Sequence, residues 1–63
     1  MAPHQQRVVD EQVALDEKLT KLLVFIGTPL YHSLEEPEQK RLQRQLRYMQ
    51  QYSEVLAERI AAF

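Results

Sequence analysis

The residues best placed to do chemistry are four cations in the second half of the 63-residue chain. At helical spacing they occupy less than half of a helix surface, and two tyrosines one turn apart follow them. Arginine binds phosphate oxygens and tyrosine stacks on bases, so this pattern is typical of nucleic-acid binding. It is more typical of a solvated helix face, because glutamates lie just upstream and the charge of the chain is balanced. The basic face comprises Lys40, Arg41, Arg44 and Arg47, and the tyrosines are Tyr48 and Tyr52.

A second charged stretch runs from Asp10 to Lys18 and carries several carboxylates. Paired carboxylates can perform acid–base chemistry or bind a divalent cation, but that work needs a concave site. No histidine lies within one turn of them, so we interpret the stretch as a solvated helix surface. His32 follows Tyr31 in a turn. It could sense pH or bind a partner, but a turn histidine is more often simply exposed.

Signatures of enzymes and of metal sites are missing from the sequence. The chain has no cysteine, which excludes disulfides and thiolate zinc sites. It also has no glycine-rich phosphate loop, nucleophile motif or metal signature. We therefore expect no catalytic residue, no metal ligand and no cofactor, and we expect that the protein is not an enzyme.

Charge and hydropathy narrow the range of partners. With 8 basic and 9 acidic residues, the formal net charge is −1, which gives no global field to attract nucleic acid or an anionic membrane. No apolar stretch approaches the roughly 20 residues that span a bilayer. The N-terminal stretch lacks the apolar core of a signal peptide. We expect a soluble, intracellular protein with no membrane partner.

Helix-forming residues dominate, and the only glycine and the prolines divide the chain into two long segments. The first is expected to be helical over about 4–26 and to end at Gly27 in the left-handed conformation. A turn over 27–34 separates it from a second helix over about 35–63. We therefore expect one domain over residues 1–63.

Residues of the turn have the pattern of helix starts. Thr28 and Pro29 resemble an N-cap followed by a proline at the first helical position, which predicts a single helical turn. Ser33 and Glu36 have the spacing of a capping box, which predicts the start of the second helix.

Both long segments carry apolar stripes with spacings of three and four residues. The first stripe is Val8, Leu15, Leu19, Leu22 and Ile26, and the second is Leu42, Leu46, Met49, Leu56, Ile60 and Phe63. A neighbouring stripe on the second helix adds Tyr48, Tyr52, Val55 and Ala62. Together the two stripes of that helix cover roughly 200°, which is more than one partner helix buries.

The spare stripe predicts association. We expect an all-α fold: an antiparallel two-helix hairpin with a short helical turn in the connection, which dimerises into a four-helix bundle. The residues that we expect at the oligomer or partner interface are Tyr48, Tyr52, Val55, Phe25 and Tyr31.

Nearly the full length of the chain resembles small helical proteins from the accessory regions of tailed phages and prophages. The resemblance lies in three blocks, "LDEK..KL..FI", "EQ.RL..Q" and "YS..L..RI..F". The nearest kind is the short proteins of the lambdoid exo–xis region. This resemblance implies a phage accessory protein in the bacterial cytoplasm that acts by binding host or phage proteins, and it supplies no catalytic residues.

Three functional hypotheses follow. The first is a protein–protein interaction module that binds a host factor, because the chain has more apolar helix surface than a monomer can bury. The second is a nucleic-acid-binding helical dimer that uses the basic face. The third is a counter-defence protein that sequesters a small signalling nucleotide in a pocket between subunits, where arginines near tyrosines could serve as well.

Overall fold

The computed structural model describes all 63 residues, and nearly all of them are helical. Helix α1 spans Pro3–Ile26, α2 spans Pro29–Ser33 and α3 spans Glu36–Ala61. The expectation of an all-helical fold is confirmed. None of the three helices combines the length and the apolar character that a membrane crossing requires.

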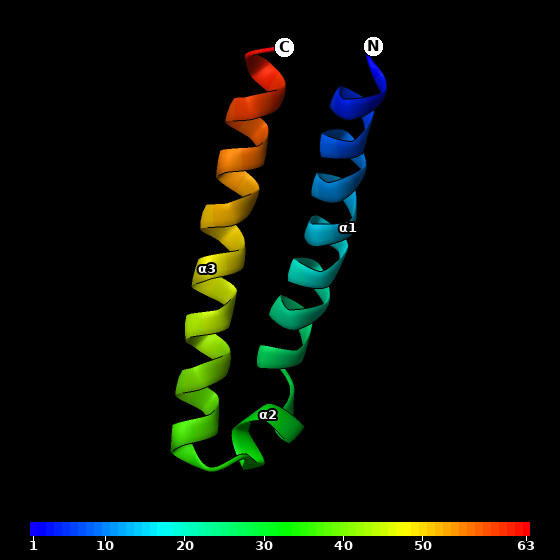
Figure 1. Ribbon diagram of the computed structural model, residues 1–63. Coiled ribbons are helices and arrows are strands. Elements are labelled where there is room, and N and C mark those ends of the chain that lie inside the picture. The colour runs from blue at the N-terminus through cyan, green and yellow to red at the C-terminus, as the bar shows by residue number, and fades with distance from the viewer.

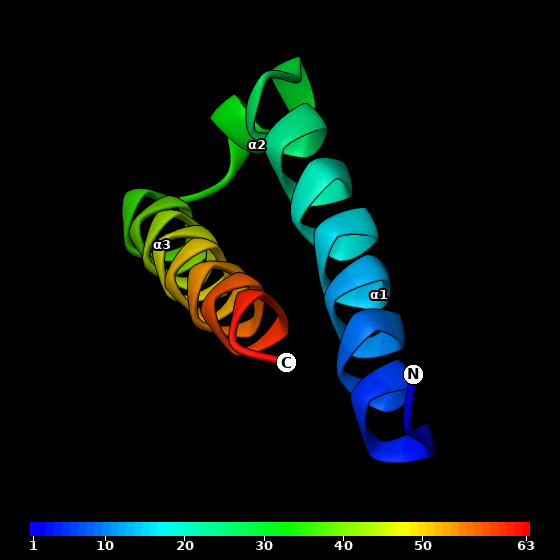
Figure 2. The same ribbon diagram turned by 90° about the horizontal axis from the view of Figure 1, so that it is seen from above.

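The two long helices lie side by side and run in opposite directions (Figure 1). Helix α2 lies where the chain reverses, and the two termini lie together at the far end. The view turned by 90° shows the same arrangement, with α2 between the ends of α1 and α3 (Figure 2). The molecule is a rod with extents of 46 × 14 × 13 Å.

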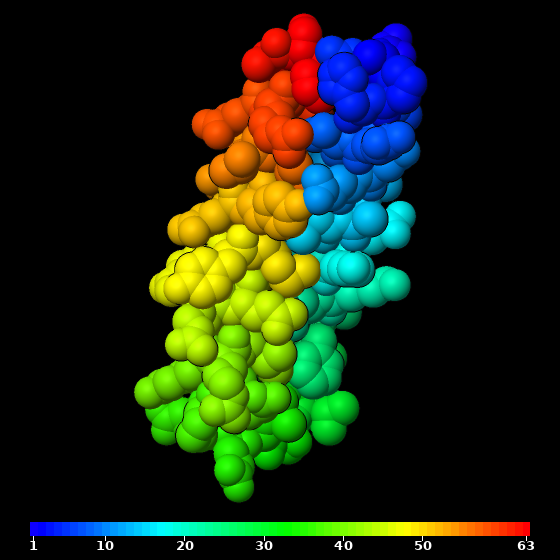
Figure 3. Space-filling model, in the orientation of Figure 1, coloured from blue at the N-terminus to red at the C-terminus, as the bar shows by residue number.

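The core is a thin seam between α1 and α3. Only Val8, Tyr31 and Leu56 are buried, and Leu56 alone has a fully buried side chain. Most other residues of the two apolar stripes are half-buried, whereas Phe63 lies beyond the end of α3 and is exposed. The space-filling view shows the side chains of the two helices meeting along one line over the length of the rod (Figure 3). Each long helix therefore keeps most of its circumference in solvent.

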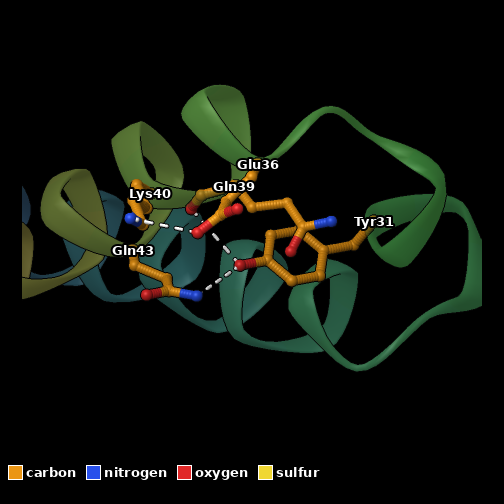
Figure 4. Close-up of polar contacts among 5 residues, drawn as sticks. All are labelled: Tyr31, Glu36, Gln39, Lys40 and Gln43. Carbon is orange, nitrogen blue, oxygen red and sulfur yellow. Dashed lines mark hydrogen bonds and ion pairs between the residues drawn. The ribbon is translucent and has the colours of Figure 1, made fainter.

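The connection is held by Tyr31, which packs inside the chain (Figure 4). Its hydroxyl donates to the carbonyl of Gln39 at 3.2 Å and accepts from Nε2 of Gln43 at 2.7 Å. Its ring meets the ring of Phe25 edge-on, with 6.1 Å between centroids. These contacts attach α2 to both long helices. Tyr31 is one of the residues predicted at an oligomer or partner interface, and in the single chain it is 3% exposed.

Gly27 ends α1, but it does so without the left-handed conformation predicted from the sequence. Its φ is −80° and its ψ is 0°, and the chain has no residue with positive φ. The amides of Gly27 and Thr28 bond to carbonyls three residues back, which tightens the last turn. In addition, the Thr28 hydroxyl donates to the Phe25 carbonyl at 2.6 Å. The helix end is therefore satisfied by a tight turn and a side chain, and glycine is not required for it.

Replacement of Gly27 by alanine is accordingly expected to stabilise the protein by about 0.4–1 kcal/mol. The added Cβ would meet only the Val24 carbonyl oxygen, at an ordinary 3.5 Å, and alanine has fewer unfolded conformations to lose. Urea denaturation of the two proteins measures the difference. A loss of stability on this substitution would show that the turn requires glycine after all.

The capping residues of the turn follow the sequence prediction only in part. Thr28 is the N-cap of α2, and its hydroxyl accepts from the amide of Tyr31 at 3.3 Å, as predicted. Ser33, however, donates to the carbonyl of Leu30 at 2.6 Å and forms no capping box with Glu36. The N-cap of α3 is Glu35, which has no side-chain capping bond. Because the Ser33 hydroxyl bonds to a carbonyl within α2, it does not cap α3.

Candidate functional site

The outward stripe of α3 leaves three large apolar side chains open beside charged groups. Tyr48, Tyr52 and Val55 are 55%, 44% and 49% exposed. Each of them directly precedes a residue that faces α1, so it lies beside the seam, where α1 leaves a large part of the side chain exposed. This places three of the five predicted interface residues on one open surface, while Phe25 is half-buried against Tyr31.

A groove of about 570 Å³ lies along this stripe. Every residue that lines it belongs to α3, so the groove has one wall and is open on the other side. Its lining combines two arginines, two tyrosines, a glutamine and a methionine. These residues are Arg41, Arg44, Gln45, Tyr48, Met49 and Tyr52.

The cations of the basic face differ in how far they are neutralised. Lys40 pairs with Glu36 at 3.1 Å, and Arg41 pairs with Glu38 at 2.8 Å. Arg47 lies over the ring of Tyr48, with 5.2 Å from Cζ to the centroid. Arg44 forms no ion pair within the chain. Exposed pairs of this kind are weak, so an incoming anion can compete for Arg41 and bind Arg44 directly.

A polar layer crosses the seam beside the groove. The Tyr52 hydroxyl donates to the carboxylate of Glu11, and the Ser53 hydroxyl donates to Asp16 at 2.6 Å. Nε2 of Gln12 donates to the Ser53 carbonyl at 3.3 Å. These bonds fix the level of α3 against α1, and they hold the Tyr52 ring at the edge of the groove.

This layer was not predicted, although Ser53 interrupts the apolar stripe of α3 and Gln12 interrupts that of α1. Two polar gaps that come level in an antiparallel pair are the signal that could have revealed it.

One match to a known protein family identifies the family of this chain. The model of a protein family described as Sequestin matches residues 2–62. The chain belongs to the Sequestin family. Sequestin proteins are small phage or prophage proteins, which agrees with the coarser part of the resemblance seen in the sequence. No curated protein and no solved structure matches the chain significantly.

Two other features of this Sequestin chain offer less chemistry. A hollow on α1 is lined by Val13, Asp16, Glu17, Thr20 and Lys21. Its carboxylates do not converge with other ligands, and no group of three or more potential metal ligands lies together in the chain. His32 is exposed, with Nδ1 2.9 Å from the Thr28 carbonyl oxygen. The groove on α3 is therefore the candidate site.

The polar layer changes the acidity of one residue of the groove. The hydrogen bond to Glu11 raises the pKa of Tyr52 above its ordinary value of 10.0. Desolvation and the negative charge of Glu11 act in the same direction, while Arg59 opposes them. The neutral phenol is thus the form that the folded protein prefers.

This preference predicts a change of stability at alkaline pH. Because the pKa is raised on folding, the contribution of Tyr52 is complete below about pH 10 and is lost as the pH rises through the raised value. We expect wild type to be more stable than Tyr52→Phe near neutral pH, and the difference to shrink above about pH 10. Urea denaturation of both proteins across this range tests it. A difference that stays constant with pH would contradict the role of the Glu11 bond.

Proposed function

We propose that this Sequestin chain sequesters a small anionic ligand with a planar ring, a molecule of the nucleotide class, in the groove on α3. The protein acts by stoichiometric binding and performs no reaction. In this proposal it is a phage or prophage accessory protein, of the exo–xis type or a similar one, that lowers the free concentration of a signalling molecule in the bacterial cytoplasm.

The observation that carries the proposal is the union of arginine and tyrosine in one groove. Arg41 and Arg44 supply guanidinium groups for phosphate oxygens, and such charge-assisted bonds are among the strongest that a protein makes. Tyr48 and Tyr52 supply rings on which a base can stack, which contributes about 1–3 kcal/mol per base. A stretch of one helix thus offers both halves of nucleotide recognition.

A groove with one wall is incomplete. Sites for small molecules usually enclose about 70–90% of the ligand surface, and a single helix cannot do this. The proposal therefore includes a second copy of the chain, seated on Tyr52 and Val55, which gives the groove its other wall. The product is a dimer of hairpins, that is, a four-helix bundle.

The area of the free chain supports this dimer. It exposes 4804 Å², whereas a compact monomer of its mass exposes about 4,250 Å² by the scaling of folded proteins. Its radius of gyration is 14.5 Å, against about 11 Å for a compact chain of this length. The excess surface is of the order of the roughly 800 Å² that each partner buries in a stable interface.

A host protein is the second candidate partner. Exposed tyrosines beside an arginine are frequent hot spots of protein interfaces, and Tyr48, Tyr52 and Arg44 form such a group. Binding of nucleic acid by the basic face is less well supported, because two of its four cations already pair with glutamates.

A thermal-shift screen with linear and cyclic nucleotides tests the proposal. A ligand at 100 times its Kd stabilises the folded state by about 2.7 kcal/mol. For a chain of this size we expect Tm to rise by roughly 10 °C or more. Tyr48→Ala should abolish the shift because it removes the stacking surface.

Leu30→Ala is the matched control, since Leu30 is 64% exposed and does not line the groove. It should retain the full shift. If no nucleotide raises Tm, while a bacterial protein binds wild type and not Tyr48→Ala, the host-protein function replaces the one proposed.

A further inference from the structure

We infer that the second copy packs antiparallel, α3 against α3, in one register, and that this register builds an anion site from residues of both copies. The anion site rests on the function proposed above, whereas the register does not. Both follow from the order of residues along the outward surface of α3.

The outward stripe continues beyond its aromatic centre along nearly all of α3. Its members are spaced alternately by four and three residues, which is the repeat of a helix–helix seam. The spacing is unbroken over three heptads, from Arg41 to the C-cap residue Ala62 of a helix of 26 residues. The stripe consists of Arg41, Gln45, Tyr48, Tyr52, Val55, Arg59 and Ala62.

The flank of this stripe that points away from α1 carries a positive charge near its N-terminal end and a negative charge near its C-terminal end. Arg44, Gln51 and Glu58 recur there at intervals of seven residues, and all three are exposed. Neither Arg44 nor Glu58 has an ion-pair partner in its own chain. Both charges are thus free to pair with another molecule.

One antiparallel register satisfies both charges. When residues 39–61 of the two α3 helices overlap, Tyr48 lies across from Tyr52 of the second copy, and Gln45 lies across from its Val55. In this register the flanking residues of the two helices also meet. Arg44 of each copy faces Glu58 of the other, which gives two ion pairs, and Gln51 faces Gln51 of the second copy. A shift by one heptad sets Arg44 against Gln51 or beyond the helix. In a parallel pair of α3 helices, Arg44 would lie level with Arg44 of the second copy, so that like charges would meet.

The same register places two cations together at each end of the seam. Arg41 of one copy faces Arg59 of the other, beside the groove that Tyr48 lines. Like charges at this separation repel unless an anion lies between them. Each dimer thus has two anion sites, and each site takes one arginine from each copy. Arg59 does not line the groove of the single chain, so its contribution depends on the second copy.

Charge reversal tests the register. Arg44→Glu and Glu58→Arg should each raise the dimer dissociation constant by about tenfold, because two ion pairs become two repulsive contacts. The double variant should return to within about threefold of wild type, since the pairs are restored with opposite sign. Lys21→Glu, an exposed residue on α1 outside the stripe and its flank, is the control and should not change it. Sedimentation equilibrium measures all four. A double variant no better than the single ones would overturn the register.

Inorganic pyrophosphate, used alone as the probe in calorimetry, tests the anion site. Arg59→Ala should weaken its binding by about tenfold, while the free protein still sediments as a dimer. Equal binding by wild type and Arg59→Ala would overturn the composite site. If the charge swap and pyrophosphate binding succeed while every nucleotide fails, the inference stands and the proposed function falls.

Discussion

Replacement of Leu56 by alanine is expected to unfold most of the protein at 37 °C. Leu56 is the only fully buried side chain, and it lies in the seam between α1 and α3. Leucine-to-alanine changes in a core cost about 2–5 kcal/mol. By the usual scale of about 0.05–0.15 kcal/mol per residue, a chain this short has only about 3–9 kcal/mol to lose. Circular dichroism during heating and in urea measures the loss.

Val13→Ala is the control for this substitution, because Val13 lies on the same rod but is 55% exposed. It should change the free energy of unfolding by less than about 0.5 kcal/mol. If Leu56→Ala were as stable as Val13→Ala, the seam between α1 and α3 could not be what holds the fold.

The second large effect is expected from placing two charges on the outward stripe. Tyr52→Asp combined with Val55→Asp should yield a monomer that is also largely unfolded. Burial of an apolar side chain of this size contributes roughly 1.5–3 kcal/mol, and each residue counts twice at a two-fold seam. Because association stabilises only the folded state, loss of the dimer lowers the stability of the fold itself. Sedimentation and circular dichroism of the same samples separate the two effects.

Val13→Asp with Thr20→Asp applies the same change of charge to the hollow on α1 and should leave both assembly and fold intact. A Tyr52→Asp, Val55→Asp protein that remains folded would mean that this face is open in the free protein and serves only to bind a partner.

The helices themselves could be read from the sequence because local signals and periodicity agree. The stripes of α1 and α3 repeat at the helical period, and Thr28 with Pro29 starts α2 as the pattern indicates. Periodicity also indicates which residues a single neighbour leaves uncovered, so Tyr48, Tyr52 and Val55 could be predicted to be open. These properties depend on residues close together in the chain.

Two features of the turn could not be read from the sequence, because they depend on side-chain hydrogen bonds that helical periodicity does not indicate. Tyr31 lies in a polar turn, and nothing local shows that Gln39 and Gln43 bind its hydroxyl and draw it inward. Gly27 has the sequence pattern of a left-handed cap, but the Thr28 hydroxyl bonds to the last turn and makes that conformation unnecessary.

The sequence indicates which residues line the groove but not how they are arranged. Its arginines and tyrosines are evident as a charged segment followed by two aromatic residues. Which cations are free depends on the pairing of Lys40 and Arg41 with upstream glutamates. The orientation of Tyr52 depends on Glu11, which lies 41 positions away in the sequence. The ion pairs lie within α3, whereas the contact between Tyr52 and Glu11 depends on how α1 and α3 pair.

Native mass spectrometry of the purified chain, mixed at tens of micromolar with an equimolar set of linear and cyclic nucleotides, tests the central claim most directly. It reports the number of chains and the mass of any bound ligand in one spectrum. The account predicts a dimer that carries a nucleotide, and no bound nucleotide when Tyr48→Ala is measured in the same way. A wild-type spectrum that contains only ligand-free monomer would contradict both the assembly and the function.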